Sequence, residues 1–179
     1  MSLTDDWSDS DIAAYLTFCG VCQVPLEVGI TVWANESDNK TTAHNPNGHA
    51  SGLNQLMPQT ARGLGYDTTT DPYLAGYREF TPAGQLAWVT KYYQPHAGGL
   101  GSVGRLYVAT FLPALLEHGD DMAFELCALA GPYSWAYRAN LGFDRTGKGS
   151  IVVQDLVDAA NRAVGPRTRE LLARIGAAQ

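Results

Sequence analysis

The sequence has few charges, few bases and few cysteines, and it has no long apolar run. Charged residues make up 17% of its 179 residues, and 12 bases against 18 acids give a net charge of -6. Binding of nucleic acid needs a basic surface, so this balance argues against nucleic acid as a partner. The longest mostly apolar stretch, Leu106 to Leu116, is broken by Thr110 and Pro113. It is shorter than the ~20 apolar residues that span a bilayer, so no membrane span is predicted.

The N-terminal segment also lacks the features of a signal peptide. Met1 to Asp11 carries four aspartates and no basic stretch followed by an apolar one. We therefore expect synthesis in the cytoplasm, with another route of delivery if the substrate lies outside it. The three cysteines are an odd number, so at least one is not in an internal disulfide. Cys19 and Cys22 end a predicted helix and do not follow a strand, which favours buried thiols over a redox pair.

The remaining pattern is mostly helical, with Gly-, Pro- and Asn-rich interruptions and few strand signals. The helices that it predicts cover about 12–19, 25–36, 58–63, 82–94, 105–118, 120–129, 154–164 and 166–175, with a break at Pro113. The length fits one domain, since domains commonly run ~100–200 residues. We predict a single mostly-α domain over 1–179, with its core at about 10–165 and its C-terminal helices at 154–176.

Glu36 is the first candidate for chemistry. It stands where an apolar helix containing Trp33 gives way to a polar loop that runs to Gly52. Burial raises the pKa of a carboxyl group because it disfavours the charged form. A carboxylic acid that is still protonated near neutral pH can donate a proton to a glycosidic oxygen. By position alone, an ordinary residue near solvent at the end of a helix is the commoner case.

Two motifs flank this loop. They are Ala34-Asn35-Glu36-Ser37 and Gly52-Leu53-Asn54-Gln55-Leu56-Met57-Pro58-Gln59-Thr60-Ala61, and Gly52 follows Glu36 by 16 residues. In order and spacing they resemble the lytic transglycosylases of the soluble-lytic-transglycosylase and goose-type lysozyme superfamily. The resemblance implies a lysozyme-like fold, α+β with minimal β structure. It also implies cleavage of the β-1,4 bond between MurNAc and GlcNAc in peptidoglycan glycan strands.

The resemblance implies a role for each motif residue. Glu36 would be the general acid/base, and Ser37 would orient the sugar or Glu36. Gln55 would hydrogen-bond the glycan, and Gly52 would let the backbone approach the sugar because no side chain stands in the way. Asn54 occupies the position where the family usually has Met, which makes the wall of the groove more polar.

The third motif of the family, Ala-Tyr-Asn-Ala-Gly, is absent in its usual form. Ala128 to Pro132 keeps its Ala-Gly ending, and Ala136 to Asn140 keeps its Ala-Tyr. The tyrosine of this motif helps to place the catalytic glutamate in the family. Tyr137 is the candidate for that role and for substrate binding. Candidates for stacking on sugar faces are Tyr93, Tyr66, Tyr73 and Tyr92.

The downstream half is similar to lysozyme-like domains of phage virion and tail proteins. The segments that carry this similarity begin at Gln85, Leu106 and Tyr137. The similarity implies phage virion or tail proteins as partners. It also implies action on the cell wall, from the virion or as an endolysin released at lysis. A bacterial domain taken from a longer exported protein is the alternative origin.

The outcome of the reaction depends on the number of carboxylates that act. The family uses one glutamate, which protonates the leaving oxygen and then accepts the proton of the C6 hydroxyl, so that a 1,6-anhydro-MurNAc ring closes. A second carboxylate that holds a water would make the protein a hydrolytic muramidase. Asp38 is the nearest candidate for that group. Asp67, Asp71 and Glu79 lie in the next loop. A non-catalytic, wall-binding module of a phage tail is the third alternative.

No cofactor and no metal are predicted. His44 and His49 follow Glu36 without a third ligand at metal spacing. Residues 144–155 have the outline of an EF-hand loop, but Lys148 brings a cation to a ligand position and Asp155 replaces the bidentate glutamate. We expect this loop to keep its turn shape without an ion, with Lys148 in place of the ion's charge.

Overall fold

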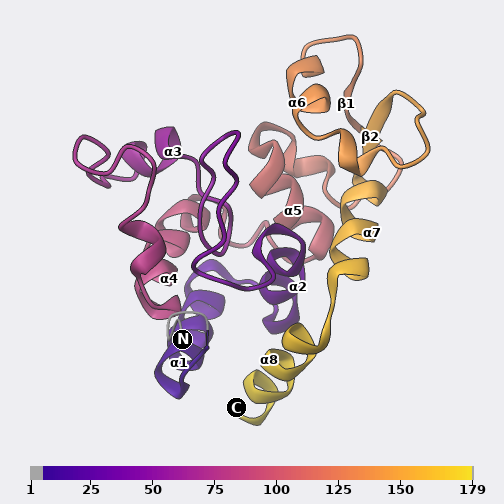
Figure 1. Ribbon diagram of the computed structural model, residues 1–179. Coiled ribbons are helices and arrows are strands. Elements are labelled where there is room, and N and C mark those ends of the chain that lie inside the picture. The colour runs from indigo at the N-terminus through magenta and orange to yellow at the C-terminus, as the bar shows by residue number, and fades with distance from the viewer. Residues whose placement is uncertain (1–5, 179) are drawn as a thin grey trace.

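Helix α2 (Leu26–Ser37) is the centre of the structure, a computed structural model that describes residues 6–178 (Figure 1). Met1–Asp5 and Gln179 belong to the predicted domain but lie outside the described residues. The helices that pack against α2 are α1 (Asp9–Cys22), α5 (Val103–Phe111), α7 (Val153–Ala163) and α8 (Pro166–Ala177). Residues 28–34 of α2 are buried, so this helix can hold a side chain at its end in a fixed place.

Most of the remaining elements are shorter than α2. They are the helices α3 (Pro58–Gly63), α4 (Pro82–Tyr93) and α6 (Ser134–Ala139), the 3-10 helices η1 (Tyr77–Glu79), η2 (Gln94–His96), η3 (Pro113–His118) and η4 (Leu141–Phe143), and the strands β1 (Glu125–Ala128) and β2 (Ser150–Val152). The two strands pair antiparallel, with Cys127 opposite Ile151. The predicted mostly-α class with minimal β structure is confirmed.

Local signals account for most helix ends. Ser8 and Asp11 form a capping box at the start of α1, and the Thr81 hydroxyl accepts the Gly84 N–H at the start of α4. Pro113 separates α5 from η3, as predicted. Gly20 does not end α1, which continues to Cys22 because neighbouring helices pack against it.

The predicted helix over 120–129 is wrong. The segment forms the strand β1, in which Leu126 and Cys127 are buried. The periodicity of a short apolar run does not distinguish a strand from a helix, so pairing with a distant segment determines the structure. That partner is β2, and the N–H of Val153 also donates to the carbonyl of Phe124.

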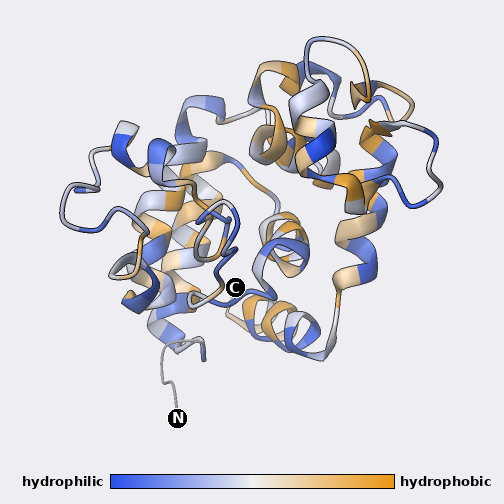
Figure 2. Ribbon diagram, turned by 45° about the horizontal axis from the view of Figure 1, so that its top comes forward, coloured by the Kyte–Doolittle hydropathy of each residue, from blue (hydrophilic) through white to orange (hydrophobic). Residues whose placement is uncertain are grey.

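An aromatic cluster surrounds α2. Trp33 packs edge-on against Tyr15 with ring centroids 5.8 Å apart, and Phe18 lies 5.4 Å from Trp33. The Tyr15 hydroxyl donates to the carbonyl of Leu26, and a Cβ at Gly29 would lie 2.8 Å from that hydroxyl. Glycine is therefore required at this position for α1 and α2 to approach. Figure 2 shows hydrophobic residues mostly on the helices and strands and hydrophilic residues in the outer loops.

No single helix among residues 6–178 is long and apolar enough to cross a membrane. Helices α1 and α2 reach the required length only together, and they are bent by 110° where they meet.

Gln85 of α4 fastens the loop that follows α2. Its side chain is fully buried, and its Oε1 accepts the N–H of Leu53 at 2.9 Å. Its Nε2 donates to the carbonyls of Thr41 and Tyr77 at 3.0 and 2.9 Å. One side-chain amide therefore hydrogen-bonds backbone groups of three segments. Buried polar groups need such partners, so Gln85 stabilises the loop.

The variant Gln85→Ala removes all of these bonds and leaves the backbone groups unpaired. We expect it to lower the free energy of unfolding by about 3 kcal/mol, because each buried group left without a partner costs roughly 1–3 kcal/mol. Urea unfolding at neutral pH measures this change. The control is Gln94→Ala, at an exposed position after the same helix. Equal stabilities of the two variants would show that the hydrogen bonds of Gln85 do not stabilise the fold.

Candidate active site

The C-terminal end of α2 is held by a Schellman-type turn. Asp38 and Asn39 both have positive φ angles, of 53° and 55°. The N–H of Asp38 donates to the carbonyl of Ala34 at 3.1 Å, and that of Asn39 donates to Trp33 at 3.3 Å. Asparagine and aspartate tolerate this conformation better than most residues. The buried Asn39 amide donates to the Thr168 hydroxyl, which ties the turn to α8.

Glu36 lies in the last turn of α2, partly buried, and its carboxyl group is bonded to a neighbouring helix. The Tyr107 hydroxyl of α5 donates to its Oε1 at 2.5 Å. Burial raises the pKa of Glu36 to about 7, and this hydrogen bond opposes the rise. The partial negative charge at a helix C-terminus acts in the same direction as burial. Glu36 therefore exchanges its proton near neutral pH.

A short chain of donors fixes this carboxyl group. The Asn35 amide donates to the Tyr107 hydroxyl at 2.6 Å, and that hydroxyl donates to Glu36. Burial, with the nearby Glu36, raises the pKa of Tyr107 well above its usual range, so the hydroxyl keeps its proton. Because the Asn35 N–H can only donate and the Tyr107 hydroxyl has a single proton, that proton is directed to Glu36.

The prediction that Tyr137 places the glutamate is corrected to Tyr107. The Tyr137 hydroxyl instead donates to Asp144 at 2.8 Å, within the EF-hand-like segment. Tyr137 belongs to α6, whereas α5 packs directly on α2 and carries Tyr107 to the catalytic candidate. The sequence offered one signal for this role, because Tyr107 is a tyrosine within the apolar helix predicted over 105–118.

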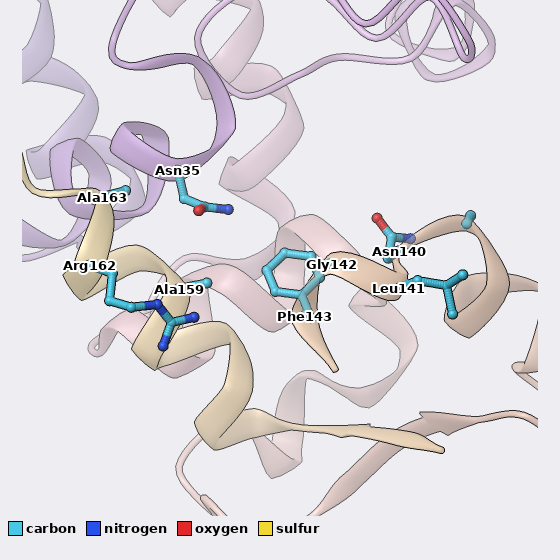
Figure 3. A pocket seen from close by; sticks show the side chains of 9 residues that line it. Asn35, Asn140, Leu141, Gly142, Phe143, Ala159, Arg162 and Ala163 are labelled. Atoms are coloured by element: carbon cyan, nitrogen blue, oxygen red, sulfur yellow. The ribbon is translucent and has the colours of Figure 1, made fainter. Parts of the chain in front are cut away.

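A groove of about 530 Å³ lies beside this chain of hydrogen bonds. Asn35 contributes one wall, η4 and the end of α6 a second, and Arg162 with its neighbours on α7 a third (Figure 3). The Phe143 ring in the groove packs edge-on against Tyr107, with centroids 5.7 Å apart. The groove therefore reaches Asn35, the residue before Glu36 on α2, whereas Glu36 itself is not among the residues that line it.

Ser37 and Gln55 bond to backbone groups. The buried Ser37 hydroxyl donates to the carbonyl of Leu53 at 2.8 Å, so it ties the end of α2 to the second motif. This contact corrects the prediction that Ser37 orients the sugar or Glu36. The Gln55 amide donates to the carbonyl of Gly52 at 3.1 Å, and the side chain is half-buried. Its predicted contact with a glycan stays a prediction.

Gly52 is needed for packing inside the protein. Its φ angle is +75°, and a Cβ there would lie 2.7 Å from the Tyr77 ring and would collide with the Gln85 amide. The residue is buried, so the prediction that its backbone meets the sugar is corrected. Glycine at this position leaves room for the buried side chain of Gln85, which hydrogen-bonds the loop.

Tyr93 is completely buried, and its hydroxyl shares a 2.6 Å hydrogen bond with Thr110. It cannot stack on a sugar in this arrangement, so that prediction is corrected. Among the other candidates, Tyr92 is half-buried and donates to the carbonyl of Ala109. Tyr73 is 57% exposed and packs against His49, which leaves it the most open ring of the four.

Three of the four candidates for a second carboxylate have other partners, and the fourth, Glu79, is exposed at the end of η1. Asp38 is exposed and pairs with Lys40 at 2.7 Å. Asp67 accepts hydrogen bonds from Thr69 and Thr70 within its own loop. Asp71 accepts the Tyr66 hydroxyl and backbone N–H groups of residues 75–77. The contacts of Asp67 and Asp71 organise their own loop, and among these acids Glu36 is the one whose pKa burial raises to about 7.

Within residues 6–178, no three His, Cys, Asp or Glu side chains gather in a way that could hold a metal. In the EF-hand-like segment, the Lys148 ammonium lies 2.7 Å from the Asp155 carboxylate. Asp144 accepts the N–H groups of Lys148 and Gly149. The lysine thus pairs with the acid at the end of the segment.

The three cysteines are buried free thiols. Burial raises the pKa of Cys19 to about 12 and that of Cys22 to about 11. Both thiols stay protonated near neutral pH, and the thiolate is the reactive form, so the Cys-x-x-Cys pair is a packing feature.

No family model, no curated protein and no solved structure matches this chain. The resemblance carried by the two motifs stays a prediction from the sequence.

The variant Glu36→Gln is expected to change stability with pH. The folded protein binds a proton at Glu36 more tightly than the unfolded chain does, so the wild type loses stability as pH rises from about 4.5 to about 7. The amide that replaces the carboxyl group does not ionise. We expect the variant to be more stable than wild type at pH 8 by up to about 3 kcal/mol and equally stable at pH 4.

Urea unfolding at the two pH values measures this difference. Glu27→Gln, at an exposed position in the first turn of the same helix, is the matched control for the loss of a charge. A Glu36→Gln protein with the same relative stability at both pH values would show that burial does not perturb Glu36.

Proposed function

We propose that this chain is a lytic transglycosylase that cleaves the MurNAc–GlcNAc bond of peptidoglycan, with Glu36 as its single general acid/base. The observation that carries the proposal is one carboxyl group with a pKa of about 7, positioned by Tyr107 and next in sequence to Asn35, which lines an open groove. A general acid works best when its pKa lies near the operating pH. Peptidoglycan as the substrate follows from the resemblance of the motifs at Glu36 and Gly52 to those of lytic transglycosylases.

The chemistry needs one group with two roles. Protonated Glu36 donates its proton to the glycosidic oxygen as the bond from that oxygen to the anomeric carbon of MurNAc breaks. The resulting carboxylate accepts the proton of the C6 hydroxyl, whose oxygen bonds to the anomeric carbon and closes the 1,6-anhydro ring. Glu36 is protonated again at the end, and no water is consumed.

The alternative of a hydrolytic muramidase needs a water held by a second group. Asp38 is the nearest carboxylate in the sequence, but its partner is Lys40. A non-catalytic wall-binding module would have no use for an acid with a raised pKa. Phage virion or tail proteins as partners, and delivery to the cell wall from a virion or at lysis, rest on the sequence resemblance and belong to the same proposal.

Mass spectrometry of the fragments released from purified peptidoglycan tests the proposal. The wild type is expected to release fragments that end in 1,6-anhydro-MurNAc, and Glu36→Gln is expected to release none. Glu27→Gln should behave as wild type. Fragments with ordinary reducing ends, heavier by one water, would make the protein a muramidase. No release by wild type would contradict the catalytic proposal and would favour the wall-binding module or a different substrate.

The activity should also depend on pH in a defined direction. The rate falls as pH rises through the pKa of Glu36, because the acid loses its proton. Tyr107→Phe removes a hydrogen bond that favours the carboxylate, so the fall should move upward by about one pH unit. The maximal rate should drop roughly tenfold because Glu36 loses its positioning contact.

The matched control is Tyr92→Phe, whose hydroxyl donates to a backbone carbonyl. It should leave the pH at which the rate falls unchanged. A profile of Tyr107→Phe that coincides with that of wild type would contradict the assigned role of Tyr107.

A further inference from the structure

Arg162 is an unpaired cation in the groove. It lies in the last turn of α7, its side chain is exposed, and it makes no ion pair or hydrogen bond with any residue among 6–178. The chain is acidic, with 18 acids against 12 bases. The cations that pair with an aspartate are Lys40, Arg105, Lys148, Arg167 and Arg174. Other cations also lack an acidic partner, but Arg162 is the one of them that lines this groove, where its guanidinium is free to pair with a ligand.

The surroundings of Arg162 suit a polar ligand with a charged group. Figure 3 shows the amides of Asn35 and Asn140 on either side of the Phe143 ring, with Arg162 on the neighbouring helix. Amides recognise hydroxyl and acetamido groups, and an aromatic ring offers a face to a sugar. The guanidinium presents a planar set of donors that matches a carboxylate with two parallel hydrogen bonds.

We propose that Arg162 binds a carboxylate group of the glycan substrate, so that the groove takes acidic muramyl glycans in preference to neutral amino-sugar chains. This inference rests on the proposed function and specifies its substrate. Peptidoglycan carries such carboxylates in two places, on the lactyl group of MurNAc that lacks a peptide and on the amino acids of the peptide stem. Both present the same group to the arginine.

The net charge of the protein makes this contact useful. At -6, the chain as a whole repels an anionic wall, although salt screens that repulsion beyond about 10 Å. A single cation in contact with a carboxylate is screened much less than charges at that distance. Arg162 therefore gives a local attraction for a carboxylate in the groove.

Binding measurements with the full chain test the inference. The background variant is Glu36→Gln, which prevents turnover, and the probes are three soluble glycans. One is a strand without peptides and with free lactyl carboxylates, one carries peptide stems, and one is a chito-oligosaccharide without carboxylates. Isothermal titration compares the background variant with the same protein carrying Arg162→Gln or Arg162→Lys. The matched control is Arg145→Gln, because Arg145 is also exposed, forms no ion pair among residues 6–178 and lies outside the groove.

We expect Arg162→Gln to raise the Kd about 10- to 100-fold for at least one carboxylate-bearing glycan and to leave the chito-oligosaccharide within about twofold. Arg162→Lys should fall between, since it keeps the charge and loses the planar donor set. Arg145→Gln should match the background. The carboxylate-bearing probe that responds identifies the source of the group. Because Arg162 is exposed and unpaired, its substitution should leave the fold intact, which circular dichroism checks.

Equal effects on charged and neutral glycans, or no effect on either, would overturn the inference. If wild type cleaves peptidoglycan while this pattern is absent, only the inference about Arg162 fails. If wild type releases no fragments but the background variant still prefers carboxylate-bearing glycans through Arg162, the catalytic proposal fails and the binding site stands. No glycan binding by the background variant and no cleavage by wild type would overturn both.

Discussion

The hydrogen bond from Tyr107 to Glu36 is the interaction around which the site is organised. It joins α5 to the end of α2 at the point where a carboxyl group is taken out of water. Burial alone would leave a reactive group without a fixed direction. The hydroxyl orients the carboxyl group, and Asn35 in turn orients the hydroxyl. The groove beside this chain of hydrogen bonds is lined by Asn35, the neighbour of Glu36 on α2.

The motif residues on either side of the loop serve mainly to hold the backbone. Ser37 bonds to the second motif, and Gly52 leaves the space that Gln85 fills. Gln85 pairs with Leu53, so α2, the loop and α4 are connected through buried polar groups. Such a network keeps the end of α2 in place although the loop has little regular structure. A motif of this kind can therefore describe support for a site as much as contact with a substrate.

The sequence predicted those parts of the fold that depend on neighbours along the chain. The caps at Ser8 and Thr81 and the break at Pro113 are local, and so is the position of Glu36 at a helix end. The strand β1 depends on a partner about 25 residues away, which its own residues do not reveal. The contact of Tyr107 with Glu36 likewise joins residues far apart in the sequence, and no motif predicted it. The role of an unpaired Arg162 also emerges only when α7 lies next to α2.

The most direct test of the account is the pKa of Glu36 itself. A carbon-13 NMR titration of the glutamate side-chain carboxyl groups, with the Glu36 signal assigned from its absence in Glu36→Gln, measures it without any substrate. We expect the Glu36 signal to titrate with a midpoint near 7, because burial raises its pKa despite the hydrogen bond from Tyr107. A midpoint near the ordinary value of 4.5 would contradict it, because Glu36 would then be ionised at neutral pH and unable to act as the acid.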